Sequence, residues 1–276
     1  MFRRILVPTD GSESAGIGVR YAVALASRHP VVLHGLHVVD VKLLEGPFLR
    51  DLSASLGTAP YVNYQNNISL ILEERGRAAL TAFQEASEQA KVTCETTLTT
   101  GIVPRTIVEY ASLSDLVILG RSGEHSQWLE GLVGSTTEAV VRRATQPVLV
   151  TGVEQPGFDR FLVAYDGSHY ARRALKTAAT ISEAWHMPFH VLVVGDAETL
   201  GLLDEARNYF QAYPVQVEYA ACTGDPAEQI IHYAQKCSAD FIVMGAYGHS
   251  KVRELVLGST TAYAINHASC PVLLTR

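Results

Sequence analysis

The sequence predicts an α/β protein made of two tandem doubly wound domains, each a five-stranded parallel sheet with helices on both faces. The first observation is an internal repeat: RRILVPTDGSESA at 3–15 resembles DRFLVAYDGSHYA at 159–171. The second is that short apolar runs alternate with amphipathic helical patterns, and parallel strands need such helical crossovers, which bury them. The third is size, since 276 residues with 47% apolar side chains can bury a substantial core.

The repeat continues in the same order to the end of both halves. SDLVILGRSG from 114 matches ADFIVMGAYG from 239, and GSTTEAV from 134 matches GSTTAYA from 258. Equivalent residues are 156 positions apart at Asp10 and Asp166 but 125 apart at Gly120 and Gly245. The first half therefore carries about 31 extra residues, which we place at about 40–67. We predict domains at 1–152 and 157–276, joined at Gln155-Pro156-Gly157.

Each half is expected to alternate strands and helices. Pro104 and Pro226 suit first helical turns, where a missing N–H is harmless, and Ser12 and Ser168 suit N-caps. In the first half we expect strands at 3–8, 31–39, 92–98, 115–119 and 147–151, with helices at 13–29, 68–90, 104–112 and 135–144. In the second we expect strands at 160–165, 189–194, 215–221, 240–244 and 271–275, with helices at 169–186, 198–212, 226–237 and 259–268.

Composition argues against several function classes. The net charge of −6 disfavours nucleic acid and membrane surfaces, which attract basic proteins. The four cysteines show no CxxC spacing, so we expect reduced, buried thiols and no metal site. No apolar run approaches the ~20 residues of a membrane span. Met1 leads directly into a strand, and we therefore expect a cytoplasmic protein.

A glycine-punctuated loop follows the fourth strand of the second half. Residues 245–261 read GAYGHSKVRELVLGSTT. Gly245 and Gly248 remove Cβ atoms where a ligand's polar groups would contact the backbone. Gly258 opens a helix whose first N–H groups lack internal partners, and such amides with the helix dipole favour an anion, usually phosphate. A plain strand-to-helix turn is the alternative, but recurrence of the pattern in the first half favours a ligand site.

Both halves resemble the universal stress protein family, here as a tandem pair. The resemblance rests on an Asp after the first strand and on G-x2-G-x9-G-[S/T] after the fourth, which Gly245, Gly248, Gly258 and Ser259 match without adjustment. It spans essentially the whole chain. It implies a sheet order of 3-2-1-4-5 and, in members with the full glycine motif, ATP binding. It also implies that the aspartate meets adenine or ribose, that a residue ending the second strand contacts adenine, and that the glycine loop surrounds the phosphates.

Together with flanking positions, the predicted binding residues fall into two equivalent sets. The first domain departs from the motif, because ten residues rather than nine separate its second and third glycines, yet an added loop residue can bulge outward at little cost. We therefore expect an adenine nucleotide in both domains. The second set is Ala164, Tyr165, Asp166, Val194, Gly245, Ala246, Gly248, His249, Gly258, Ser259 and Thr260. The first set is Pro8, Thr9, Asp10, Val38, Gly120, Arg121, Gly123, Gly134, Ser135 and Thr136.

Some of these residues have a simpler alternative reading. The Asp-Gly pairs at 10–11 and 166–167 are also common turn formers, and His249 and Arg121 could be solvated surface side chains as readily as phosphate contacts. His34 and His37 suggest a metal cluster, but strand alternation puts them on opposite faces. We therefore expect no metal there.

Three functional hypotheses follow. Neither half has the GxxxxGK[ST] of a Walker A loop, so the leading hypothesis is a nucleotide-dependent sensor or regulator with slow or absent hydrolysis, in which Mg²⁺ would neutralise phosphate charge. The second is a nucleotide-cleaving enzyme related to the adenine-nucleotide α-hydrolases. The third is an assembly module that binds nothing. The resemblance implies that the last strands, 147–151 and 271–275, pair within the chain as a pseudo-dimer, and a homodimer of chains stays open.

Overall fold

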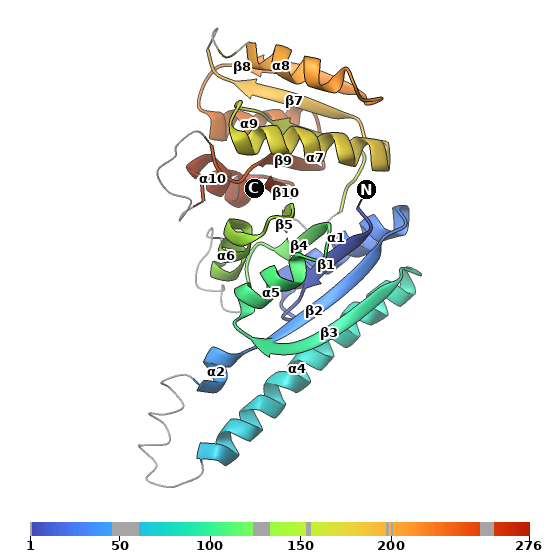
Figure 1. Cartoon of the computed structure of the whole chain (residues 1–276), viewed down its shortest axis with the longest axis vertical. Coiled ribbons are helices and arrows are strands. Elements are labelled where there is room, and N and C mark those ends of the chain that lie inside the picture. The colour runs from blue at the N-terminus through green and yellow to red at the C-terminus, as the bar shows by residue number, and fades with distance from the viewer. Residues whose placement is uncertain are drawn as a thin grey trace.

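The structure, a computed structural model, describes residues 2–45, 61–123, 133–152, 156–196, 199, 201–248 and 257–276. Its centre is a ten-stranded sheet in the order β3-β2-β1-β4-β5-β10-β9-β6-β7-β8 (Figure 1). Strands within each half are parallel. Each half is thus a doubly wound domain with the order 3-2-1-4-5, which confirms the fold class and the strand order expected from the sequence.

The first half contains five strands and the helices that cross between them. Its strands are β1 (Arg4–Pro8), β2 (Val32–Asp40), β3 (Cys94–Gly101), β4 (Leu116–Gly120) and β5 (Val148–Thr151). Its helices are α1 (Glu13–Arg28), α2 (Val41–Glu45), α4 (Tyr61–Gln89), α5 (Val103–Ala111) and α6 (Ser135–Arg143).

The second half repeats this plan without the added segment. Its strands are β6 (Phe161–Ala164), β7 (Phe189–Val194), β8 (Val217–Cys222), β9 (Phe241–Gly245) and β10 (Val272–Thr275). Its helices are α7 (His169–Trp185), α8 (Gly201–Phe210), α9 (Pro226–Lys236) and α10 (Ser259–His267). No described helix is both long enough and apolar enough to cross a membrane.

The predicted insertion is where the expected elements differ most from the structure. Strand β2 continues to Asp40 and leads directly into α2, and α4 begins at Tyr61 rather than at 68. Residues 46–60 of the insertion lie outside the described residues. The early start of α4 follows from residues 61–67, Tyr-Val-Asn-Tyr-Gln-Asn-Asn, which contain neither glycine nor proline to stop a helix.

The two halves meet at the edge strands β5 and β10, which pair antiparallel over three residue pairs, Val272 with Val150, Leu273 with Leu149, and Leu274 with Val148. This pairing hydrogen-bonds two strands that would otherwise expose their edges. Because it is antiparallel, the carboxyl ends of the strands in the first half point to the opposite edge of the sheet from those in the second.

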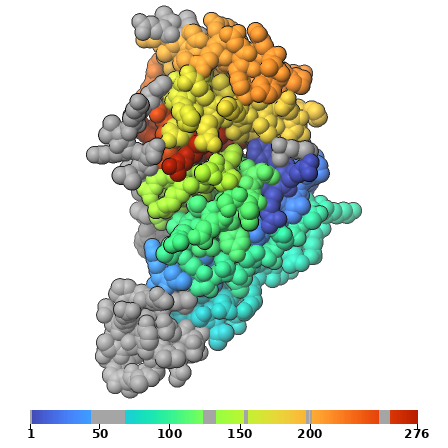
Figure 2. Space-filling view, viewed as in Figure 1, coloured from blue at the N-terminus to red at the C-terminus, as the bar shows by residue number. Residues whose placement is uncertain are grey.

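Two apolar layers run across both halves. One contains Leu25 of α1, Phe83 of α4 and Leu203 of α8, and it covers one face of the whole sheet. The other contains Ile107 of α5, Val140 of α6 and Ile265 of α10, and it covers the opposite face. The halves consequently form one continuous body in the space-filling view (Figure 2).

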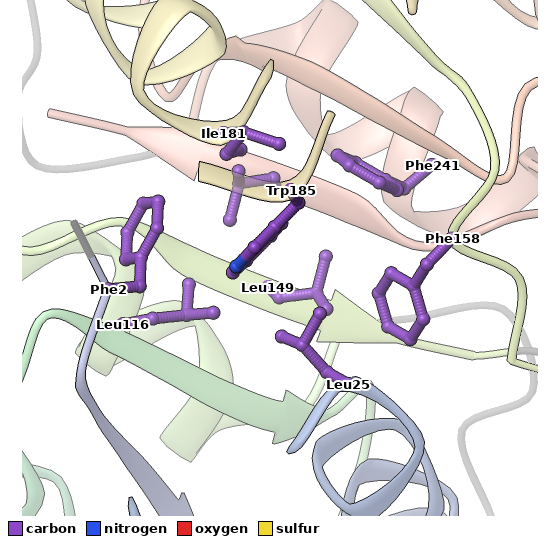
Figure 3. A pocket seen from close by; sticks show the side chains of 9 residues that line it. Phe2, Leu25, Leu116, Leu149, Phe158, Ile181, Trp185 and Phe241 are labelled. Carbon is purple, nitrogen blue, oxygen red and sulfur yellow. The ribbon is translucent and has the colours of Figure 1, made fainter. Parts of the chain in front are cut away.

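A small apolar hollow marks the seam between the halves on the α1 and α7 side (Figure 3). Its volume is about 10 Å³, which is the least space that holds a water, and its lining offers no polar partner for one. Trp185 stacks on His29 with ring centroids 5.2 Å apart. The hollow is lined by Phe2, Leu25, Leu116, Leu149, Phe158, Ile181, Trp185, Phe241 and Leu273. It is a packing defect between two domains, too small to be a ligand pocket.

Candidate functional site

An exposed aspartate follows the first strand of each half. Asp10 and Asp166 each accept a hydrogen bond at Oδ1 from the backbone N–H of the serine two residues later, at 2.9 Å in both cases. The glycine between them adopts a left-handed backbone, with φ of +79° at Gly11 and +75° at Gly167. Only glycine takes this conformation without strain. The turn therefore holds the carboxylate at the carboxyl end of the first strand of each half, and the chain then enters the next helix.

The second glycine of each loop lies directly beside this aspartate. A Cβ added to Gly123 would stand 3.1 Å from Oδ2 of Asp10, and one added to Gly248 would stand 3.2 Å from Oδ2 of Asp166. No other atom of the structure lies within 4 Å of either added Cβ among the described residues. The two halves thus place the same glycine beside the same exposed aspartate, and the absence of a side chain at this glycine leaves the aspartate uncovered there. We call this place in each half its crevice.

The first glycine has a different reason for being glycine. A Cβ on Gly120 would meet the carbonyl oxygen of Ser14 at 2.5 Å, and one on Gly245 would meet the Cβ of Tyr170 at 2.8 Å. Both contacts are with the first turn of the helix that follows the aspartate. Gly120 and Gly245 therefore permit close helix-to-strand packing, which is a structural role beside the ligand contact expected from the sequence.

The loop is tied to the sheet by its own backbone. Arg121 N–H donates to the carbonyl of Thr151 at 2.8 Å, and Ala246 N–H donates to that of Thr275 at 2.9 Å. The third glycine closes the loop, since Gly134 N–H donates to the carbonyl of Arg121 at 2.9 Å. The equivalent bond from Gly258 to Ala246 measures 3.4 Å. These amides are occupied, and they fix the position of the helix that begins at the third glycine.

The helices that begin there, α6 and α10, start without a side-chain cap. Their N-cap residues are Gly134 and Gly258, and neither provides a side-chain acceptor. In contrast, Ser12 caps α1, Ser168 caps α7 and Asp225 caps α9, each accepting from first-turn amides. First-turn amides that find no acceptor within the protein favour an anion, as does the helix dipole.

A buried threonine connects each of these helices to its strand. Thr137 Oγ1 donates to the carbonyl of Gly120 at 2.9 Å, and Thr261 Oγ1 donates to that of Gly245 at 3.1 Å. Both threonines are almost fully buried. These two threonines are not among the predicted site residues, although the identical GSTT in both halves was a sequence signal for them. They position the helix start and do not face the crevice.

Comparison with known proteins identifies the family of the chain. The model of the universal stress protein family matches residues 1–152 and 193–276, which include both glycine loops. The chain belongs to the universal stress protein family. A universal stress protein of Synechocystis is 28% identical, with 99% of this chain and all of the relative covered. One from Mycobacterium tuberculosis is 24% identical over 99% of this chain and 96% of its own length. A solved universal stress protein structure from Archaeoglobus fulgidus has a TM-score of 0.78 at 22% identity, covers 99% of this chain and 98% of its own, and shares the fold.

The remaining predicted residues of this universal stress protein lie at the ends of strands or at the starts of helices. Val38 and Val194 lie at equivalent places near the ends of β2 and β7, and both are half-buried. Pro8 and Ala164 end the first strands and are buried. Ser135 and Ser259 are exposed at the first helical position, and Thr136 and Thr260 follow half-buried at the second. The structure thus brings these residues to one end of each half.

Thr9 and Tyr165 differ although they occupy equivalent positions. Thr9 accepts a hydrogen bond from Gly11 N–H at 3.3 Å, and its own carbonyl bonds to His37 Nδ1 at 2.8 Å. Tyr165 is 2% exposed within the apolar layer. Burial, with the Glu205 carboxylate adding to it, raises the pKa of its hydroxyl well above the ordinary value. Tyr165 therefore packs beneath the crevice, and its side chain is not one of the surfaces that a ligand touches.

Arg121 departs from the expectation that it contacts phosphate. Its Nη1 donates to the carbonyl of Asn266 at 3.2 Å and lies 3.5 Å from the carbonyl of Ile265. Both carbonyls belong to the last turn of α10 in the other half. This side chain therefore joins the halves. The backbone of Arg121 remains part of the first glycine loop.

Two other expectations concern histidines. His249, a predicted phosphate contact, lies outside the described residues. His34 bonds to Thr97 Oγ1 at 2.9 Å and packs against the ring of Tyr110 on α5, whereas His37 lies against Gly76 of α4 on the opposite face. Within the described ranges, no group of three or more His, Cys, Asp and Glu side chains could hold a metal ion.

Proposed function

We propose that this universal stress protein binds ATP in each half and acts as a nucleotide-dependent sensor or regulator in the response to stress. The aspartate after the first strand binds the nucleoside end of the ligand. The first-turn amides of α6 and α10 bind its phosphates. The valines near the ends of β2 and β7 provide an apolar and backbone contact for the base.

The observation that carries the proposal is the contrast between capped and uncapped helices. A helix start costs free energy when its amides find no acceptor, and a Ser, Thr, Asp or Asn cap contributes about 1 kcal/mol. The chain places such caps on α1, α7 and α9 but glycine on α6 and α10. Helix α5 also lacks a side-chain cap, but its N-cap Ile102 is followed by a proline in the first turn, which has no N–H to satisfy. Helices α6 and α10 each follow the fourth strand of their half and the glycine loop beside the aspartate, at the carboxyl ends of the strands, where ligands bind in open parallel sheets. A phosphate would supply the missing acceptors.

The open space beside each aspartate also supports the proposal. Glycine at 123 and 248 leaves open the space beside the aspartate, where any larger residue would place atoms 3.1 to 3.2 Å from the carboxylate. Ser135 and Ser259 present exposed hydroxyls at the same helix starts. These hydroxyls donate hydrogen bonds without adding charge. Because neutral donors bind phosphate less strongly than charged ones, they suit a ligand that must also be released.

The proposed role is regulatory rather than catalytic. Mg²⁺ would accompany the phosphates mainly as a counter-charge, held by phosphate oxygens and water, as is usual for this ion. The chain's own groups then bind and orient the nucleotide. The four free cysteines fit a reducing compartment, and we propose the cytoplasm as the location. The domain limits 1–152 and 157–276 and a homodimer of chains remain predictions.

The direct test is to denature the purified protein, chromatograph the released small molecules and count nucleotide per chain. Protein stripped of nucleotide is then titrated calorimetrically with ATP, ADP and AMP in the presence of Mg²⁺. We expect two molecules of ATP per chain and weaker binding as phosphates are removed, because the helix starts bind phosphate. Equal binding of AMP and ATP would contradict the proposed phosphate site.

A turnover assay distinguishes the sensor from a nucleotide-cleaving enzyme. The protein is incubated with ATP and either Mg²⁺ or Mn²⁺, and products are counted over many binding lifetimes. We expect ATP to be recovered largely intact. Multiple turnovers with either metal would instead favour the hydrolase. A melting temperature that is unchanged by millimolar ATP would favour a module that binds no nucleotide.

A further inference from the structure

Arg121 makes three contacts that connect both crevices. Its backbone N–H is bonded to Thr151 at the end of the seam strand β5, and its carbonyl accepts from Gly134, the cap of α6. Its guanidinium donates to Asn266 in the last turn of α10. Arg121 thus contacts the seam strand β5, the start of α6 in the first half and the end of α10 in the second half.

The antiparallel seam explains how one side chain reaches both helices. The carboxyl end of β4, where Arg121 lies, points to one edge of the sheet, and that of β9 points to the other. Helix α10 begins at the far edge and runs back against its strands over nine residues, which is roughly 13 Å. The start of α10 therefore lies at the second crevice, and its last carbonyls lie beside Arg121 at the first crevice.

A second arginine makes the reverse connection. Arg276 follows β10 and donates to the carbonyl of Arg142, in the last turn of α6. The residue before it, Thr275, accepts the N–H of Ala246 in the second glycine loop. The end of α6 is therefore held by a residue next to the second crevice, just as the end of α10 is held by one next to the first.

The two arginines occupy positions that are not equivalent in the internal repeat. Each nevertheless donates to a carbonyl in the last turn of a helix of the other half. The counterpart of Arg121 is Ala246, and the counterpart of Arg276 is Gly152. A Cβ on Gly152 would lie 3.4 Å from Cζ of Arg121, so this glycine leaves space for the guanidinium. Each side of the seam holds one arginine, and a cation at a helix carboxyl end is favoured by the helix dipole.

We propose that Arg121 and Arg276 are positioning residues that couple the two nucleotide crevices, so that occupancy of one raises the affinity of the other. The inference rests on the proposed function. Phosphate bound to the first turn of α6 fixes Gly134, and with it the carbonyl and the guanidinium of Arg121. That guanidinium holds the carboxyl end of α10. The first turn of the same helix binds the phosphates of the second ATP molecule.

The coupling must be reciprocal, because each site changes the affinity of the other by the same factor. Hydrogen bonds to a charged group are stronger than neutral ones, and typical couplings between sites span about 5- to 150-fold. These contacts are few and partly exposed, so we expect the lower end, about fivefold. In a calorimetric titration this appears as an isotherm steeper than two independent sites allow.

The experiment is a set of ATP titrations that separates the sites. Gly123→Val leaves only the second crevice and Gly248→Val only the first, so the two single-site isotherms together predict the parent isotherm for independent sites. We expect the first ATP to bind the parent as predicted and the second ATP to bind about fivefold tighter than predicted. In an Arg121→Ala background, which gives the first half the residue of the second, the same three titrations should agree with independent sites.

Arg276→Gly tests the reverse connection in the same way. Arg105→Ala is the matched control, because among the described contacts this exposed arginine pairs only with Glu109 in the same helix, α5. The control should retain the excess affinity. Melting temperatures without nucleotide identify a merely structural effect, which would lower stability but leave the excess affinity intact. If both crevices bind ATP and the parent isotherm equals the independent prediction, the coupling is wrong. If the parent protein binds no ATP, the proposed function itself is wrong.

Discussion

The two crevices of this protein share a backbone frame but have different walls. In the first half Ser122 N–H donates to Ser14 Oγ at 3.2 Å, so a hydroxyl joins the loop to α1. In the second half the equivalent residues are Tyr170 and Tyr247, whose rings lie 5.3 Å apart. An apolar contact replaces the hydrogen bond. The loop is held in place in both cases, by a different kind of interaction.

What the halves keep in common therefore indicates what the crevice requires. The aspartate, the left-handed glycine after it, the second glycine and the buried threonine recur with distances that agree within a few tenths of an ångström. The residues that changed include the pair that joins the loop to the helix, as well as Thr9, whose counterpart is Tyr165. Variants of shared residues should have equal effects in both halves, and variants of the others should not.

The largest expected effect is that of a valine at the second glycine. Gly248→Val and Gly123→Val would each fill the space beside an aspartate and exclude the nucleotide from that half. We expect affinity at the altered crevice to fall at least about a hundredfold, roughly 2.7 kcal/mol. Calorimetric stoichiometry should fall from two to one in either variant and to zero in the double variant.

The matched pair makes the comparison quantitative. Among the described residues, an added Cβ meets only an aspartate oxygen at both positions, at 3.1 and 3.2 Å. Both variants should therefore fold and melt near the parent temperature without nucleotide. A loss of binding for Gly248→Val but not for Gly123→Val would show that the extra loop residue of the first half has moved its ligand elsewhere.

A smaller and equal effect is expected from the buried threonines. Thr137→Val and Thr261→Val keep the shape of the side chain but remove the hydroxyl that holds the helix start to the strand. Each should lower the free energy of unfolding by about 1 kcal/mol, measured by chemical denaturation. Thr145→Val, at an exposed threonine, is the control and should change little. Unequal losses would mean that the two loops are not equivalent.

Much of this architecture was predictable because local sequence patterns specify it and because these patterns occur in both halves. Glycine and serine after the aspartate specify a turn and an N-cap, and both caps form as expected. Apolar runs such as Phe241 to Met244 specify buried parallel strands, and these are fully covered. The repeat also identified equivalent residues across the halves, which a single copy could not do.

The remaining features depend on contacts between distant segments. The sequence gives no sign that Arg121 reaches Asn266, because that contact requires the antiparallel seam and the direction of α10 to be known first. Likewise Gly120 reads as a ligand-facing glycine, whereas its contact with Ser14 shows a packing role. Local patterns specified where the loops are, but only the assembled sheet shows which side each residue faces.

The smallest expected effect concerns His34, whose ring is buried between β3 and α5. It bonds to Thr97 and lies near Arg4, Glu95 and Tyr110. Burial lowers the pKa of His34 and outweighs the opposing effect of Glu95, and the nearby Arg4 lowers it further. The unfolded chain therefore binds a proton more readily than the folded one, and this histidine reduces stability as the pH falls below about 6.5, its unfolded pKa. His34→Gln should make the melting temperature less dependent on pH between about 7 and 5. A variant with an unchanged or steeper dependence would show that the ring accepts its proton in the folded state, held by Glu95.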